Sequence, residues 1–463
     1  MADELQFAGD FRLSPIVLYS SSDPIDLRPL MLELNLYESI HSPNMYGNLV
    51  IQDSANHKQN APIIGQEELE FEISIPDNEI IDAIKYRMRI YKVDGIQEVA
   101  ERQQVYTLHF TTKEAFKNTK LTVKNAQEGP SDVIFSKIMR GLIETKKKLH
   151  IEKANTNFKV LGNNMKPYDF IRMVAKRSQS TQYESAGFLF YENHRGIHFR
   201  SWESLIRSGD RHRKIKEEFF VTPKGSVIDP EEDMKKVNSY EIIKTQDVIA
   251  GHASGLFGSK QYNYNRINKS LSITNSNYIQ KFNKRNTTEN RGYPFLPNNP
   301  EDATNKSYSD FADARVFVSS FDNALHTQSA TDEKSYDNNE SLHQDRLHDA
   351  LDHDQIVLSV SIPGNTNIAA GDLIKLNIPS YESIDEAKDR IYDLYLSGRY
   401  IVTDVVHSVN ETSYGTTFKC VRNDVIIPYP QTDESIEDRT LYKEPFRTSV
   451  DVLKTSFVDD TEN

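Results

Sequence analysis

The fold is decided by two neighbouring pieces of sequence, GDLIKLNIP at residues 371–379 and SGRYIVTDVVHSVNETSYGTTFKCVR at residues 397–422. Apolar residues alternate with polar ones in three runs of this stretch, which begin at Ile374, Tyr400 and Tyr414. A period of two between clusters of Gly, Pro and Asn is typical of half-buried antiparallel strands. The stretch therefore predicts three β-strands.

An earlier part of the chain repeats this pattern, with a glycine, two tyrosines and a phenylalanine in the same order. The glycine-to-tyrosine interval is 26 residues in the early copy and 29 in the late copy. The two tyrosines are 15 and 14 residues apart, and the phenylalanine follows the second tyrosine by 4 residues in both copies. The residues that define the repeat are Gly65, Tyr91, Tyr106 and Phe110 in the early copy and Gly371, Tyr400, Tyr414 and Phe418 in the late copy.

Another alternating run precedes each glycine, at residues 32–36 and 358–362. Two unrelated β-hairpins could also share tyrosines and valines by chance, and this alternative stays open. The matching intervals favour a duplicated β-domain, and a real internal repeat changes the prediction of the whole fold.

Length and composition limit the possible classes of protein. A chain of 463 residues should hold several domains at roughly 100–200 residues each. The 23 Tyr and 22 Phe favour β-rich packing, and the net charge of −13 argues against a surface that grips nucleic acid. The single Cys420 cannot form an intrachain disulfide. The sequence predicts neither a signal peptide nor a membrane span.

The changes in pattern along the chain predict an α+β, β-dominated fold. A helical stripe at residues 131–147 and a second helix from Pro167 interrupt the strands, and a hairpin turns at Asn193–Gly196. Residues 251–340 are rich in Asn, Ser and Asp, which favours an extended insertion or one that a partner orders. The expected parts are a first antiparallel β-barrel (tube) domain at 1–114, a small α+β domain at 115–205, a second tube domain at 206–250 and 353–425, a polar insertion at 251–352 and an acidic arm at 426–463.

Motifs of enzyme chemistry are absent from the sequence, which has no HExxH, GxSxG, GxxxxGK or GxGxxG. Cys420 lies in an alternating strand, so it is expected in the core rather than as a nucleophile. Asp345, Asp349 and His353 share a helical face that could hold a metal ion, although a solvated helix face is the simpler interpretation. We therefore predict no catalytic residue, cofactor or metal site.

Several phrases of the sequence resemble the baseplate central hub protein of contractile-tailed bacteriophages, a family related to late-control tail proteins and to the spike base of type VI secretion. These phrases are FYENHRGIHF at 190–199, IPGNTNIAAGDLIKLNIP at 362–379, YIVTDVVHSVNETSYGTTFKC at 400–420, YESIHSPNMYGNLVIQD at 37–53 and PIIGQEELEFEI at 62–73. The resemblance covers about residues 1–250 and 340–425 and includes no catalytic motif.

The resemblance implies a homotrimer in which each chain carries two similar tube domains. Six such domains would match a sixfold tail tube protein on one side, while the threefold symmetry would match a central spike protein on the other. The implied location is the virion tail baseplate, assembled in the host cytoplasm beside other baseplate proteins. DNA would only pass through the ring, and an acidic lumen would let it slide. That Glu68, Glu70 and Glu72 line this passage is a hypothesis, because the net charge alone does not place them.

Two other functions remain open at this level. A carbohydrate-binding or adhesin-type tail protein would explain the tyrosine-rich strands, and it would bind host glycans without a tube partner. A tail-associated hydrolase would need an acid pair or a metal, for which Asp349 and His353 are the candidates. Neither function requires the duplicated domain.

Overall fold

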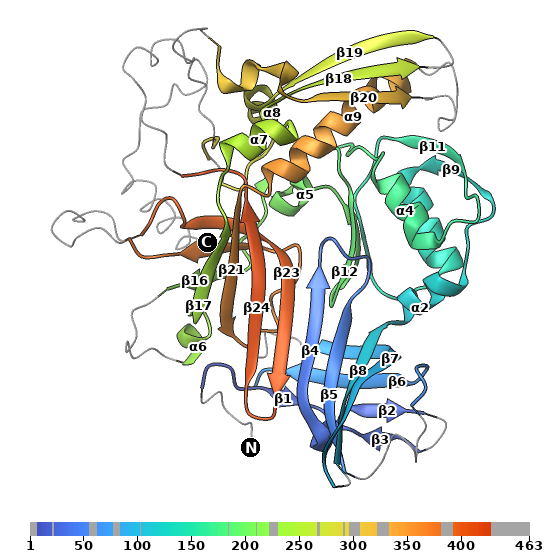
Figure 1. Cartoon of the computed structure of the whole chain (residues 1–463), viewed down its shortest axis with the longest axis vertical. Helices are drawn as coiled ribbons and strands as arrows, with labels where there is room; N and C mark the ends of the chain where they lie inside the picture. The colour runs from blue at the N-terminus through green and yellow to red at the C-terminus, as the bar shows by residue number, and fades with distance from the viewer. Residues whose placement is uncertain are drawn as a thin grey trace, which may run out of the picture.

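The computed structural model has the β-dominated α+β fold that the sequence predicts (Figure 1). The structure describes residues 7–20, 23–54, 63–76, 84–101, 103–183, 185–209, 211–221, 230–265, 269–289, 292–295, 306–321, 333–380 and 392–426. Except for Ile426, the arm predicted at 426–463 lies outside the described residues.

The first group of strands, unit 1, is built from the amino-terminal residues. Leu69, Phe71 and Ile73 are buried while the glutamates between them are not, which is the alternation that the sequence predicts. The strand order is β4 (Met31–Ser39), β5 (Tyr46–Asp53), β8 (Gln103–Thr112), β7 (Ile84–Ala100) and β6 (Glu68–Ser74), followed by β2 (Val17–Tyr19) and β3 (Ile25–Asp26), with β1 (Arg12–Leu13) also on β6 and the short helix η1 (Arg28–Leu30) before β4.

The second group, unit 2, has the same strand order. It runs through β17 (Ser239–Lys244), β21 (Ile356–Pro363), β24 (Tyr414–Arg422), β23 (Gly398–Asn410) and β22 (Leu373–Asn377), with β16 (Glu218–Phe220) beside β22 and α6 (Pro230–Asp233) before β17. Each strand of unit 2 thus corresponds to one strand of unit 1: β17 to β4, β21 to β5, β24 to β8, β23 to β7 and β22 to β6.

The pairing registers of the two units match along a row that crosses four strands. A row across unit 1 joins Leu34, Leu49, Leu108 and Val93, and a row across unit 2 joins Tyr240, Val360, Phe418 and Val405. Both units also have a β-bulge at the same place, between Ile90 and Lys92 in β7 and between Val402 and Asp404 in β23. Bulges are specific features of a strand pair, so their agreement supports duplication of the whole unit.

The registers correct the alignment of individual residues in the repeat. Phe418 corresponds to Leu108 and not to Phe110, because both Phe418 and Leu108 lie in the rows defined above. Tyr91 lies at the bulge of β7 and is 49% exposed, whereas Tyr400 is fully buried. The sequence intervals therefore find the correct strands, but the tyrosines and phenylalanines that they pair lie two or three positions apart.

The two units form one continuous sheet, because β23 pairs with β4 in antiparallel register. Figure 1 shows the red strands of unit 2 beside the blue strands of unit 1. Among the described strands the hydrogen-bonded path has two ends, so the sheet they form is open rather than closed into barrels.

The α+β domain packs beside this sheet, and Phe135, Phe170 and Phe199 lie in its core. Pro167 begins a helix as predicted, and the predicted hairpin turns at Asn193–Gly196. The elements are α2 (Lys113–Lys120), β9 (Ala126–Pro130), α3 (Ser131–Lys137), the π-helical turn η2 (Ile138–Leu142), β10 (Leu149–Ile151), β11 (Asn157–Leu161), α4 (Pro167–Ala175), β12 (Leu189–Asn193), β13 (Gly196–Arg200), α5 (Glu203–Ile206), β14 (Arg207–Ser208) and β15 (Arg211–His212).

The described part of the polar insertion is folded, so the expectation of an extended segment is wrong there. Its three-stranded sheet packs a polar face against α9, where Gln344 donates to the carbonyl oxygen of Ser259 at 3.3 Å and to that of Thr274 at 3.4 Å. The elements are α7 (Val248–Ser254), β18 (Gly258–Asn265), β19 (Ser270–Asn277), α8 (Tyr278–Lys284), η3 (Tyr308–Asp310), η4 (Ala312–Ala314), β20 (Val316–Phe321) and α9 (Glu333–Asp352).

Candidate functional site

The junction between the two units brings distant parts of the chain together. The outer half of β23 lies along β4, with Val409 opposite Leu34 and Val405 opposite Glu38. All three apolar side chains are fully buried. The junction therefore belongs to the core, and it fixes how one unit follows the next.

Glu38 of β4 is the buried charge at this junction, with 1% of its surface exposed. One carboxylate oxygen accepts a hydrogen bond from the backbone nitrogen of His194 at 2.8 Å and lies 2.9 Å from the Nδ1 atom of its ring. The other accepts from the backbone nitrogen of Ala370 at 3.2 Å. Burial alone would raise the pKa of Glu38, but the charge and hydrogen bonds of His194 outweigh burial and lower it.

The turn between β12 and β13 supplies His194 and binds unit 2 as well. Asn193 donates to the carbonyl oxygen of Ala370 at 2.9 Å, and Arg195 pairs with Asp372 at 2.6 Å. Glu38 and this turn thus connect unit 1, unit 2 and the α+β domain at one point. The sequence predicted the turn but carried no signal for these contacts, because the partners lie far apart along the chain.

A second buried group joins the α+β domain to unit 1. Glu192 of β12 accepts a hydrogen bond from the hydroxyl of Thr112 at 3.0 Å and pairs with Lys147. Lys147 also pairs with Glu114 at 2.9 Å. These contacts fix the start of α2 against the end of β12, so the connection between the two domains is rigid.

The residues that define the repeat take structural positions. Gly65 and Gly371 have φ angles of +97° and +91°, which favour glycine. Five of the eight members are buried aromatic residues, and Tyr91 is half-exposed. The buried members are Tyr106 and Phe110 in unit 1 and Tyr400, Tyr414 and Phe418 in unit 2, and Gly371 lies beside the hydroxyl of Tyr191. Cys420 is fully buried as expected, and burial raises the pKa of its thiol.

The candidate metal-binding face of α9 packs against α8 and α5, where Asp349 and His353 are buried and Asp345 pairs with Lys281 at 2.9 Å. Asp349 lies 3.3 Å from Arg285 and accepts a hydrogen bond from Ser185 at 3.2 Å. The ring of His353 lies 2.7 Å from the carbonyl oxygen of Asp349 and stacks on Trp202. Within the described ranges, no group of three or more His, Cys, Asp or Glu side chains is arranged to hold a metal ion.

Burial raises the pKa of two carboxyl groups on this face, to about 7 for Asp349 and to about 8 for Asp352. Asp352 accepts a hydrogen bond from Asn423 at 2.9 Å, which lowers the pKa of Asp352 but offsets only part of the effect of burial. The carboxyl groups of Asp349 and Asp424 raise the pKa of Asp352 further. The contact between α9 and the end of β24 is therefore most favourable when Asp352 is protonated.

Replacing Asp352 by asparagine is expected to flatten the pH dependence of stability. The pKa of Asp352 rises from an ordinary 3.8 to about 8, so the folded chain holds a proton that the unfolded chain releases. This contribution is complete below about pH 4, declines by about 1.4 kcal/mol per pH unit, and levels off above about pH 8. Urea unfolding should show Asp352→Asn gaining stability relative to the parent chain as the pH rises from about 5 to about 8. A difference that does not change with pH would contradict this explanation.

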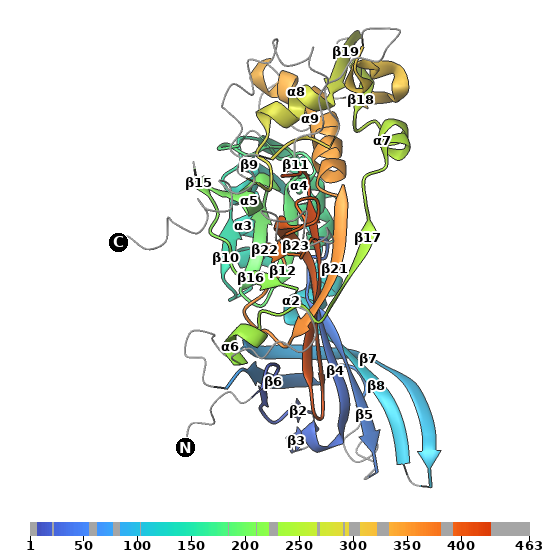
Figure 2. The same cartoon turned by 90° about the vertical axis from the view of Figure 1, so that its left-hand side faces the viewer.

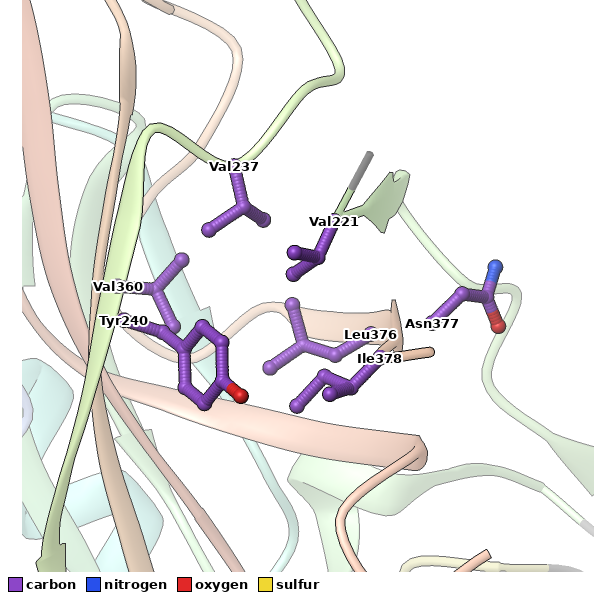
Figure 3. Close-up of a pocket in the computed structure, with 7 residues that line it drawn as sticks. All are labelled: Val221, Val237, Tyr240, Val360, Leu376, Asn377 and Ile378. Atoms are coloured by element: carbon purple, nitrogen blue, oxygen red, sulfur yellow. The ribbon is translucent and has the colours of Figure 1, made fainter. Parts of the chain in front are cut away.

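A small apolar hollow lies at one side of unit 2 (Figure 3). Its lining comes from β17, β21, β22 and the segments beside them, and the side chains nearly fill it. The lining residues are Val221, Val237, Tyr240, Val360, Leu376, Asn377 and Ile378. Tyr240, which belongs to the edge strand β17, thus has its ring against the core of the unit.

The glutamates of β6 form a ladder with basic residues of β7. Glu68, Glu70 and Glu72 lie opposite Arg89, Arg87 and Lys85, respectively. Lys85 is 3.3 Å from Glu72, and Arg87 is 3.6 Å from Glu70. These glutamates therefore do not form a purely acidic surface, because each lies opposite a positive charge.

Comparison with known proteins confirms the resemblance to baseplate hub proteins of contractile-tailed phages. The chain is 23% identical over 405 residues to the probable baseplate hub protein gp334 of Vibrio phage KVP40, which covers 83% of this chain and 88% of that protein. No protein-family model matches the chain.

None of the helices in the described residues is long and apolar enough to cross a membrane.

Solved structures of phage tail proteins show weaker similarity. The 43 kDa tail protein of prophage MuSo2 from Shewanella oneidensis has a TM-score of 0.49 and 9% identity, over 89% of this chain and 99% of that chain. A tail protein from Neisseria meningitidis MC58 has a TM-score of 0.47 and 9% identity, over 88% and 96%.

Proposed function

We propose that this chain is a structural hub of a phage tail baseplate, and that three copies close a ring of six similar β-units. The ring would join a sixfold tail tube protein to a threefold central spike protein. The observation that carries the proposal is the duplicated unit, with equal strand order, matching registers and a matching bulge. The similarity to a baseplate hub protein supports the same role.

The duplication provides a physical reason for the ring. A heterologous contact between copies must either close or continue into a filament, and closure with two units per chain presents 3 × 2 = 6 similar surfaces. Three identical chains can then contact a sixfold partner on one side and a threefold partner on the other. The buried contacts of Glu38 and Glu192 would keep both units at fixed positions while the tail contracts.

The mass of the purified full-length chain by native mass spectrometry tests this proposal, alone and with its tube or spike partner. The expected result is a trimer, and ring-averaged electron micrographs should show six similar lobes. A chain that remains monomeric under all these conditions, or a ring without such lobes, would overturn the proposal.

The proposed ring would also give DNA a passage during ejection, with β6 facing it. Replacing Glu68, Glu70 and Glu72 by lysine is expected to leave particles assembled but to lower infectivity, because lysines that neutralise phosphates would hold the DNA. The variant also places like charges opposite each other, which should lower the free energy of unfolding by about 0.2–1 kcal/mol per pair. The measurement is the number of plaques per assembled particle.

The matched control adds Lys85→Glu, Arg87→Glu and Arg89→Glu to the three lysine changes. This variant restores opposite charges across the strands and the original net charge. Infectivity should recover in it if electrostatics is the cause. Full infectivity of the three-lysine variant would sink the assignment of β6 to the passage.

A further inference from the structure

The three-stranded sheet of the insertion buries a polar face and exposes an apolar one. Ser259, Gln261 and Asn263 of β18 lie on the face that packs toward α9, and each is at most 2% exposed. The side chains of the other face alternate with these residues along the strand. Figure 2 shows β18 and β19 at one end of the molecule, with α9 between them and the rest of the chain.

The exposed face carries a continuous apolar patch, because the pairing registers bring its members together. Tyr262 lies opposite Ile273 of β19 and opposite Val318 of β20, and Tyr264 lies opposite Leu271. Leu271 and Ile273 are 60% and 55% exposed, and Val318 is 79% exposed. A contiguous exposed apolar patch marks a surface that another element covers. The patch consists of Tyr262, Tyr264, Leu271, Ile273, Val316 and Val318.

The segment of sequence that follows the described chain can reach this patch. Asn423, just after β24, donates to Asp352 of α9 at 2.9 Å. Val425 exchanges backbone hydrogen bonds of 2.8 and 3.0 Å with Tyr293, in the segment after α8. The chain therefore leaves unit 2 beside α8 and α9 of the insertion. Residues 427–445 can span roughly 60 Å when extended, about twice the length of the 20-residue α9.

The sequence beyond residue 445 carries an apolar stripe that matches a sheet face. Phe446, Val450, Leu453 and Phe457 are separated by four, three and four residues, the spacing of one face of an α-helix. Pro445 precedes the stripe, and proline is common at the first position of a helix. A helix of residues 446–457 would be about 18 Å long, shorter than the roughly 27 Å of the 8-residue β18.

We propose that residues 446–457 form a helix that docks on the apolar patch of the insertion in the same chain. The sheet would then lie between two helices, with α9 on its polar face and the docked helix on its apolar face, a layered arrangement that buries both the patch and the stripe. The contact does not depend on the proposed ring, because both of its parts belong to one chain. It keeps the apolar patch out of water in the free protein.

The rate of maleimide labelling of a Val318→Cys variant of the full-length chain tests this docking. The native Cys420 is fully buried, so the introduced cysteine should be the one that reacts. Docking should slow its labelling at least about tenfold, the factor that corresponds to about 1.4 kcal/mol of docking free energy. Adding Val450→Asp and Leu453→Asp should restore fast labelling, because a carboxylate on the stripe cannot be buried against apolar side chains without a large cost.

The matched control is Thr448→Asp with Thr455→Asp in the Val318→Cys chain. It adds the same charge on the opposite side of the expected helix, so the cysteine should stay protected. Val133→Cys provides the reference for an uncovered site, since Val133 lies on α3 and is 50% exposed. It should react quickly with and without the changes in the arm.

Fast labelling of Val318→Cys in the otherwise unchanged chain would overturn the docking. Protection that survives Val450→Asp, Leu453→Asp would also overturn it, because a second copy or another protein would then cover the patch. Co-expression of this triple variant with an excess of the parent chain should leave its cysteine reactive. Protection in such mixtures would show that the segment comes from a neighbouring copy and would overturn docking within one chain. The trimer and the six lobes of the proposed hub are measured separately, so either proposal can fail alone.

Discussion

Replacing Glu38 by alanine is expected to lower the free energy of unfolding by about 3–5 kcal/mol, the range for breaking a buried charged pair. The substitution removes the acceptor of the backbone nitrogens of His194 and Ala370, which lie at 2.8 and 3.2 Å. Both donors stay buried without this partner, and each unsatisfied group costs about 1–3 kcal/mol. The junction of the two units and the α+β domain should therefore open at a lower concentration of urea.

The single Trp202 provides a local probe for this measurement. It lies in a buried cluster with Ile40, Val357 and Ile401, so its fluorescence reports the region where β4, β21 and β23 meet. Glu33→Gln is the matched control on the same strand, since Glu33 is exposed and glutamine keeps an oxygen that can accept from Asn35; this change should alter stability by less than about 0.5 kcal/mol. Equal unfolding midpoints for the two variants would refute a structural role of Glu38.

The sequence predicts the strands of both units well, because their apolar residues alternate with a period of two. It does not predict which residues correspond between units, since this depends on bulges and pairing registers. Tyr91 shows the difficulty, because the bulge beside it turns an apparent core position into a half-exposed one. Tyrosine intervals therefore indicate the duplication without giving its register.

The sequence does not predict the folded sheet of the insertion, for a different reason. Gln261, Asn263 and Ser259 are buried on the face of β18 that packs toward α9. Gln261 donates hydrogen bonds to Asn263 and to Ser319, and Gln344 donates to the hydroxyl of Ser259. A sheet with a polar buried face looks like a loop in composition. Predicting it would require knowing the partners of each amide group, which come from distant segments.

The functional junction could be predicted only in part. The repeat indicates two similar units, but the pairing of β23 with β4 joins residues more than half the chain apart. Glu38 is one of many glutamates in the sequence, and only the fold brings His194 and Ala370 to its carboxylate. Which strands lie at the edges of the sheet depends on the same long-range pairing.

Replacing both Ile242 and Ile243 by lysine is expected to convert the proposed trimer into monomers. Both side chains are about half-exposed on β17, so the fold of the single chain should change in stability by less than about 0.5 kcal/mol. In the proposed ring, an edge strand with exposed apolar side chains such as β17 would meet the next protomer, where two introduced lysines would lose hydration. Lysines on an edge strand are also a natural means of preventing strand pairing.

Native mass spectrometry of the full-length chain measures the effect, and circular dichroism with urea unfolding checks that each chain stays folded. The matched controls are Ile249→Lys and Val318→Lys, which change exposed apolar residues of α7 and β20 rather than of β17. These variants should remain trimeric, because the loss of a general apolar surface is not what the proposal requires. If the Ile242→Lys, Ile243→Lys variant is still a trimer, the copies meet at another surface and β17 is not part of the contact.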